Sequence, residues 1–281
     1  MSSTGIIGIL LIIANVIISY KGFNSHAFFD RYKFNIDSIR LYKEYKRLVT
    51  SDFLHVGWTH LIFNMLSLYI FSGPIEAYLG SVNFLLIYFA SGIGANLLTL
   101  LIHWRDGSYS SVGASGAVSG VIFACIALFP GMQMGLFLLP LRIPAWLFGV
   151  LYIAFSMYGI KSKRDNVGHE AHLGGALVGM LVAILIYPAA FANNYLPILL
   201  IAVPSIIFIY LIVTRPHLLL IDNLYYKTHR NHYSPDHKYN EERRNKQEEI
   251  DRILDKISQR GINSLSEKEK EILKRHSRGV R

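Results

Sequence analysis

Charged residues are scarce in this chain. Asp, Glu, Lys and Arg make up 17% of the 281 residues, whereas hydrophobic residues make up 52%. Soluble domains carry about 25% charged residues, so this composition excludes an ordinary soluble domain and indicates a membrane protein.

The chain has only one cysteine and no basic cluster before its first apolar run. The single cysteine, Cys125, excludes an internal disulfide, and its place within an apolar run is typical of a small core residue. No Lys or Arg precedes the first apolar run at residues 5–20, and no small-x-small cleavage site follows it closely. We therefore expect a retained helix there rather than a cleaved signal peptide.

What the chain does contain is apolar runs of membrane length. A helix needs ~20 mostly apolar residues to cross a bilayer. Seven candidate spans approach that length, at residues 5–20, 56–73, 82–103, 112–130, 134–160, 170–191 and 195–213. The sequence thus predicts an all-α, polytopic membrane bundle over residues 1–214.

Residues 215–281 differ in character, with 16 Lys and Arg against 11 Asp and Glu. Isoleucines at helical spacing, a stop at Gly261 and a capping box formed by Ser266 and Glu269 predict a helical hairpin at residues 241–276 of an extramembrane tail. Mixed-sign charge on such a hairpin is typical of a solvated face, so no nucleic-acid partner is expected.

The segment between the first two runs, residues 21–54, interleaves Phe and Tyr with Lys and Arg. It is not apolar enough to cross a bilayer. Amphipathic and aromatic side chains of this kind favour a folded element at the membrane interface.

Several strongly polar side chains interrupt the apolar runs. Each needs a partner or a task, because such groups are costly at membrane depth. His60 and Asn64 are four residues apart and share one helix face, and His55 lies more than a turn earlier, near the water boundary. His169 and His172 open the sixth run.

The stretch "GASGAVSG" at residues 113–120 puts Ser115 at the expected start of the fourth helix. A serine hydroxyl becomes a nucleophile when a base takes its proton, and His172 is a candidate base. His60, Asn64 and the Ser115 amide are candidate donors to an oxyanion. Glycines around both residues permit a tight turn and close helix approach, and they are Gly113, Gly116, Gly174 and Gly175.

Four segments, "RLVTSDFLHVGWTHLIFNM", "GPIEAYLG", "GASG" and "AHLGG", together resemble the rhomboid intramembrane serine proteases over about residues 5–190. The resemblance implies a six-helix core with a Ser–His dyad below the membrane surface. It implies single-pass membrane proteins as substrates, cut within or beside their membrane helix, and no cofactor. By position it makes Ser115 the nucleophile, His172 the general base, His60 and Asn64 the oxyanion-hole side chains and His55 a supporting residue.

The resemblance also assigns structural roles to Glu76, near the opposite membrane face, and to the loop residue Arg47. Two departures stand out. Ser119 occupies a position that is often aromatic in the family and packed on the catalytic histidine, so another group must hold His172 in place. The seventh run and the charged tail exceed the minimal six-helix core.

Two other interpretations stay open. A metal site could be assembled from four histidines, His55, His60, His169 and His172. The only nearby acids, Asp165 and Glu170, lie at a loop end, and Glu170 projects away from the His172 face, which favours a dyad without an acidic third member. The other alternative is a non-proteolytic relative that binds or remodels client helices. Such relatives lack the serine or the histidine, and both are present here.

We expect a multi-pass integral protein of a bacterial inner membrane, with the lipid bilayer as its surroundings. The resemblance puts the N-terminus in the cytoplasm and the site toward the outer face, so seven spans would leave the tail outside. The Lys and Arg residues of the first loop and of the tail favour the cytoplasmic side instead. The side of the tail stays open.

Overall fold

A computed structural model of the chain describes residues 5–135, 142–162 and 167–215, together with seven residues of the tail, Ile253, Lys256, Ile257, Leu265, Ser266, Glu269 and Lys270. The chain divides into two units, Met1–Lys227 and Thr228–Arg281. The predicted boundary after residue 214 falls at the end of the helix Ala189–Thr214 and stays a prediction.

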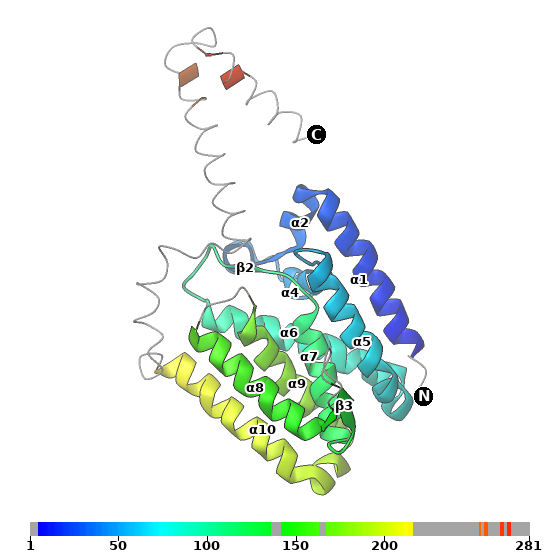
Figure 1. The fold of residues 1–281 in the computed structure, drawn as a ribbon. Helices are drawn as coiled ribbons and strands as arrows, with labels where there is room; N and C mark the ends of the chain where they lie inside the picture. The colour runs from blue at the N-terminus through cyan, green and yellow to red at the C-terminus, as the bar shows by residue number, and fades with distance from the viewer. Residues whose placement is uncertain are drawn as a thin grey trace. The chain divides into compact units, whose positions relative to one another are not determined.

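Apolar helices dominate the described part of the first unit (Figure 1). They are α1 (Ile6–Asn24), α5 (Trp58–Leu79), α6 (Ser81–Ile102), α7 (Ser115–Leu128), α8 (Ala145–Ser162), α9 (His169–Ile186) and α10 (Ala189–Thr214). Each covers most of a different predicted run, and α10 also includes the last three residues of the sixth run. In the described residues, five of these helices are long and apolar enough to cross a membrane, and α5 joined to Arg47–Phe53 through a 97° bend adds a sixth. The prediction of an all-α, multi-pass membrane protein is confirmed.

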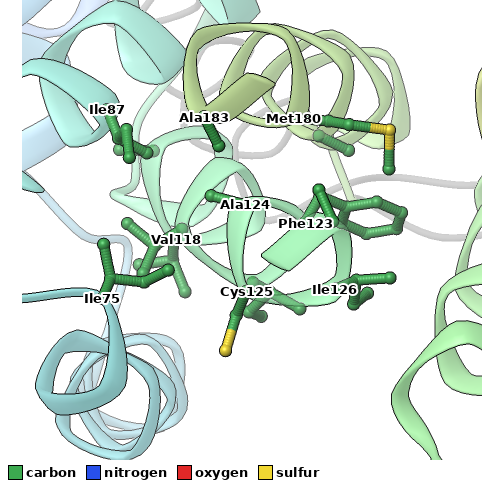
Figure 2. Packing of buried hydrophobic residues seen from close by; sticks show 14 of the residues in the cluster. Ile75, Ile87, Val118, Phe123, Ala124, Cys125, Ile126, Met180 and Ala183 are labelled. Atoms are coloured by element: carbon green, nitrogen blue, oxygen red, sulfur yellow. The ribbon is translucent and has the colours of Figure 1, made fainter. Parts of the chain in front are cut away.

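The central helix α7 is too short to cross a bilayer. Its 14 residues span about 21 Å at 1.5 Å per residue, against a hydrocarbon thickness of about 30 Å. Every residue from Gly116 to Leu128 is buried, and Figure 2 shows side chains of α7, among them Val118, Phe123 and Ile126, in the core. Cys125 is buried there too, as a free thiol. At least one end of α7 must therefore lie within the membrane thickness, where its backbone groups need partners from the protein.

At the C-terminal end of α7 those partners come from α10. Asn194, at a kink in α10, donates from Nδ2 to the carbonyl oxygens of Ala127 at 2.9 Å and Leu128 at 3.4 Å. The last carbonyls of a helix receive no hydrogen bond from an N–H group of the same helix. The Asn194 side chain is the donor to two of them. The predicted seventh helix is thus an integral part of the packing of α7.

Glycines bring α7 and α9 into direct backbone contact. A Cβ atom at Gly175 would overlap the carbonyl oxygen of Gly116, and a Cβ atom at Gly179 would overlap that of Gly120. This four-residue spacing of small residues on both helices is how membrane helices approach closely. Gly174 faces α6, where its Cβ position lies 3.0 Å from a methyl carbon of Leu98.

The first helix is anchored by a carboxylate from α5. Glu76 accepts the backbone N–H groups of Ile7 (3.2 Å) and Gly8 (3.3 Å), and Ser81 donates to it at 2.8 Å. The N–H groups of a first helical turn attract an anion in this way. A Cβ atom at Gly5 would overlap the carboxylate, so the close approach requires glycine at this position.

The segment between α1 and α5 is folded. It contains α2 (His26–Tyr32), β1 (Phe34–Asn35), α3 (Ile36–Arg40), α4 (Arg47–Thr50) and the 3-10 turn η1 (Ser51–Phe53). Strand β1 pairs antiparallel with β2 (Ser110–Ser111), and a second small ladder joins β3 (Gln133–Gly135) to β4 (Arg142–Pro144).

Arg47 holds this segment together. Its guanidinium donates to the carboxylate of Glu44 at 2.6 Å and to the backbone carbonyls of Asp30 and Lys33 at 2.7 Å each. The side chain is buried. A buried guanidinium is tolerated because it is paired and hydrogen-bonded.

In the described residues of the tail, Ser266 and Glu269 form the predicted capping box. The amide of Ser266 donates to the Glu269 carboxylate at 2.7 Å, and the amide of Glu269 donates to the Ser266 hydroxyl at 3.3 Å. Lys256 bonds both carboxylate oxygens at 2.9 Å. Ile253 and Leu265 are buried. Most of the predicted hairpin at 241–276 lies outside the described residues.

We predict that Gly179→Ala lowers the free energy of unfolding by about 3 kcal/mol, because the added methyl overlaps the backbone of α7 and forces the helices apart. Reversible unfolding in detergent measures it. Gly131→Ala is the matched control, since no atom lies within 4 Å of a Cβ there. Equal effects of the two substitutions would contradict the α7–α9 contact.

The ionisation of Glu269 in the tail should depend on its hydrogen bonds. Hydrogen bonds from Lys256 and from the Ser266 amide lower the pKa of the Glu269 carboxyl from 4.5 to about 2. A lowered pKa means that the ionised form stabilises the fold above pH 4.5 and that this contribution is lost as the pH falls toward 2. Carboxyl ¹³C shifts of the labelled full-length chain in micelles should give that pKa, and Lys256→Met should raise it toward 4.5. Titration near 4.5 in the unsubstituted chain would contradict the capping box.

Candidate active site

Ser115 and His172 lie in the first turns of two helices that touch. Ser115 is the first residue of α7, and His172 lies in the first turn of α9. Their neighbours mark the contact, since a Cβ atom at Gly116 would lie 3.5 Å from the carbonyl oxygen of Ala171. Ser115 and His172 are each half-buried, whereas the rest of α7 is fully enclosed. The two side chains therefore lie at the same end of the α7–α9 contact, where α7 is no longer fully buried.

The loop before Ser115 has a fixed, unusual conformation. Gly113 has φ of +134°, which side chains other than glycine rarely adopt. Its N–H donates to the carbonyl of Ser51 at 3.1 Å, and the next amide, of Ala114, donates to Nε2 of His55 at 3.5 Å. Two segments that precede α5 thus hold the entry to α7.

His55 donates a hydrogen bond through one ring nitrogen and accepts one at the other. The Ser19 hydroxyl donates its one proton to the carbonyl of Phe53 at 2.9 Å, so its contact of 2.8 Å with Nδ1 of His55 has the imidazole N–H as donor. Nε2 is then unprotonated and accepts the Ala114 amide. His55 is fully buried. Its geometry links α1 to the loop before Ser115 and gives it no opening to a substrate.

His60 and Asn64 lie beside this loop on α5. The His60 ring meets the edge of the His55 ring at 4.9 Å, and its Cε1 lies 2.6 Å from a Cβ position at Gly113. Asn64 is buried and donates to the carbonyl of His60 at 3.0 Å. Among the residues that the structure describes, Nδ1 of His60 is buried without a hydrogen-bond partner. A buried, unpaired ring nitrogen next to the Ser115 loop is free to bind a polar atom of a ligand.

An aromatic ring from α8 contacts His172. The Tyr152 and His172 ring centroids are 6.0 Å apart at an interplanar angle of 37°, and the Tyr152 hydroxyl lies 2.7 Å from the Ser119 hydroxyl. Glu170 is engaged elsewhere, by the Tyr109 hydroxyl at 2.6 Å and by Nε2 of His103 at 3.1 Å. The sequence-based expectation that Glu170 projects away from His172 agrees with these contacts.

Sequence reasoning missed a buried polar group beneath the site. Asn96 on α6 donates to Asp52 at 2.8 Å and to the carbonyl of Leu48 at 2.9 Å, and the Asp52 carboxyl packs on Gly92. This contact ties η1, and through Ser51 the Gly113 loop, to α6. An asparagine within an apolar run was the available signal for it. Nothing in the sequence indicated Tyr152.

The geometry gives no support to the alternative of a histidine-liganded metal. Within residues 5–135, 142–162 and 167–215, no three His, Cys, Asp or Glu side chains converge closely enough to share an ion. His55 and His60 form one pair of rings, and His169 and His172 form another at 6.0 Å. Asp165 lies outside the described residues.

Residues 42–189 match the model of the rhomboid domain, and residues 233–279 match a family of unknown function (DUF6576). The putative rhomboid protease YdcA of Bacillus subtilis is 37% identical over 50% of this chain and 67% of its own length. The mitochondrial RHOMBOID-like protein 12 of Arabidopsis thaliana is 28% identical over 63% of this chain and 56% of its own length. For the rhomboid protease GluP of Bacillus subtilis the identity is 31%, over 50% of this chain and 26% of its own length. This chain therefore spans less than two thirds of two of these relatives.

The match to the rhomboid domain covers more than half of the 281 residues. It includes both helix starts that carry Ser115 and His172, and the apolar helices around them form the multi-pass bundle that the sequence predicted. The chain belongs to the rhomboid family.

Proposed function

We propose that this protein is an intramembrane serine endopeptidase that cuts membrane proteins within or beside their membrane helix. The observation that carries the proposal is the backbone contact between the start of α7, with Ser115, and the first turn of α9, with His172. The relatives named as rhomboid proteases support it. The proposed location is a bacterial cell membrane. Mitochondrial and chloroplastic relatives make an organelle membrane the alternative.

In the proposed reaction, His172 takes the proton of the Ser115 hydroxyl as the oxygen attacks the substrate carbonyl. The imidazolium then gives that proton to the leaving amine, and an acyl-enzyme remains on Ser115. Water, deprotonated by His172, hydrolyses the ester and restores the serine. Glu170 takes no part, since Tyr109 and His103 bind it.

Three groups are available for the oxyanion. The first-turn N–H groups of α7 have no acceptor within the helix, and the helix start is electropositive. His60 presents a ring nitrogen beside Gly113, and Asn64 lies one turn farther along α5. Asn64 donates to its own helix in this structure, so binding the oxyanion requires it to exchange that bond for one to the substrate.

Substrates of this site are expected to contain helix-weakening residues near the cut. A helical peptide bond is shielded by its own hydrogen bonds, and inside a bilayer no water replaces them. Glycine or proline lowers the cost of unwinding the segment. A stably helical segment should be cut slowly.

We predict that Ser115→Ala and His172→Ala each reduce cleavage of a single-pass substrate with a helix-breaking membrane segment by about 10³-fold or more, because each removes one half of the dyad. The assay uses purified protein in detergent. Ser111→Ala, four residues earlier in β2, is the matched control and should cleave as the unsubstituted protein does. A fluorophosphonate should label the unsubstituted chain and Ser111→Ala but not Ser115→Ala.

Equal cleavage by the unsubstituted chain and Ser115→Ala would refute the nucleophile. If no form cleaves across a panel of substrates and none is labelled, a role in binding or remodelling client helices replaces the proposal.

We further predict that Asn64→Ala lowers kcat by about 10²-fold with a smaller change in KM, since an oxyanion donor acts mainly in the transition state. Asn83→Ala is the matched control. Asn83, in the first turn of α6, likewise donates to the carbonyl four residues earlier, that of Leu79 at the end of α5, at 2.8 Å. A loss of kcat shared by both variants would point to helix stability instead.

A further inference from the structure

The aromatic ring that contacts His172 from the neighbouring helices is Tyr152 of α8, and α7 has Ser119 at the position one turn after Ser115. Ser119 stands one helical turn after Ser115, on the same face of α7, and its side chain is too small to reach across to α9 as a ring would. Ser119 is nevertheless only 2% exposed and has a defined partner, the Tyr152 hydroxyl at 2.7 Å.

The half-buried Tyr152 ring has aromatic contacts on three helices. Its centroid lies 5.4 Å from Phe123 of α7, 6.0 Å from Phe148 of α8 and 6.0 Å from the imidazole of His172 of α9. All three distances fall within the range of about 4.5–7 Å over which rings attract. These ring contacts and the hydrogen bond of its hydroxyl restrain the Tyr152 side chain next to His172.

We infer that Tyr152 is the positioning residue for His172 and that Ser119 orients Tyr152 through the hydroxyl pair. The inference rests on the proposed function. Ser119 and Tyr152 belong neither to the dyad nor to the oxyanion donors. Ser119 leaves space for a ring that arrives from α8 and bonds that ring's polar end. The nucleophile helix thereby orients its own general base through a third helix.

The requirement follows from the geometry of proton transfer. A general base must keep its acceptor nitrogen within hydrogen-bond reach of the hydroxyl it deprotonates. In a dyad with no acidic third member, that orientation has to come from packing and from hydrogen bonds other than those of a carboxylate. If Tyr152 acts through His172 alone, loss of the ring lowers kcat and leaves KM nearly unchanged.

A double-substitution cycle tests the hydroxyl pair. Tyr152→Phe and Ser119→Ala should each lower kcat about 3- to 10-fold, and the combined variant should be no slower than the slower single one, since both remove the same bond. Multiplication of the two effects in the combined variant would overturn the link between Ser119 and Tyr152.

Removal of the ring tests the positioning itself. Tyr152→Leu should lower kcat about 10²-fold with KM within about twofold, whereas Phe155→Leu should keep kcat within about twofold. Phe155 is the matched control, an aromatic residue of α8 that contacts the other histidine of α9, His169, at 5.2 Å. Moving the ring to α7 in the pair Ser119→Tyr and Tyr152→Ala should restore part of the lost kcat. Equal losses in Tyr152→Leu and Phe155→Leu would overturn the inference.

A readout without catalysis separates this inference from the proposed function. In the ¹⁵N-histidine-labelled full-length protein, Tyr152→Leu should shift the His172 ring resonances while unfolding in detergent stays cooperative. Unchanged His172 resonances would overturn the inference even if the protein cleaves. A shift in a protein that cleaves nothing would support the contact and count against the protease.

Discussion

The direct contact between the backbones of α7 and α9 is the constraint on which the rest of this structure depends. It exists because two glycines of α9 pack against carbonyl oxygens of α7. Gly175 packs against the carbonyl of Gly116, and Gly179 packs against that of Gly120. Van der Waals contact over such small residues is a main source of helix association in a membrane, where lipid is as apolar as a side chain. The contact fixes both the depth and the rotation of α7 relative to α9. Residues in their first turns consequently have a set relation to one another.

A short helix at the centre of a membrane bundle brings a second constraint, since the backbone groups at its ends cannot turn to lipid. Polar side chains that look out of place in the apolar runs meet this need. Asn194 binds the last carbonyls of α7, and His55 with the Ser51 carbonyl binds the amides that precede it. Other buried polar side chains of the described residues tie neighbouring segments together, as Arg47 and Asn96 do. Half-buried His60, with its unpaired Nδ1, lies instead beside the Gly113 loop of the proposed site.

The sequence predicted the helices well because membrane length and hydropathy are local properties, and the seven apolar helices follow the seven runs. It also predicted the family, because four motifs in a fixed order are readable without a structure. Contacts between distant segments could not be predicted in the same way. In the sequence, Ser119 stands out only as a serine where the family often has an aromatic residue, because a motif is compared position by position along one chain. The ring that contacts His172 comes from Tyr152, 33 residues later, and no local pattern connects the two.

The proposed orientation of His172 by an aromatic ring rather than a carboxylate has a physical reason at this depth. An ionised carboxylate inside a membrane protein costs several kcal/mol of desolvation unless it is paired and hydrogen-bonded, of order 3 kcal/mol at a helix centre. Glu170, the carboxylate nearest in sequence, lies at the start of α9 and has both of its described partners, Tyr109 and His103, at that end. A tyrosine buries its ring with no such cost and needs one partner for its hydroxyl, which Ser119 supplies. In the proposed dyad, the base can thus be oriented one turn below the helix start without a charge at that depth.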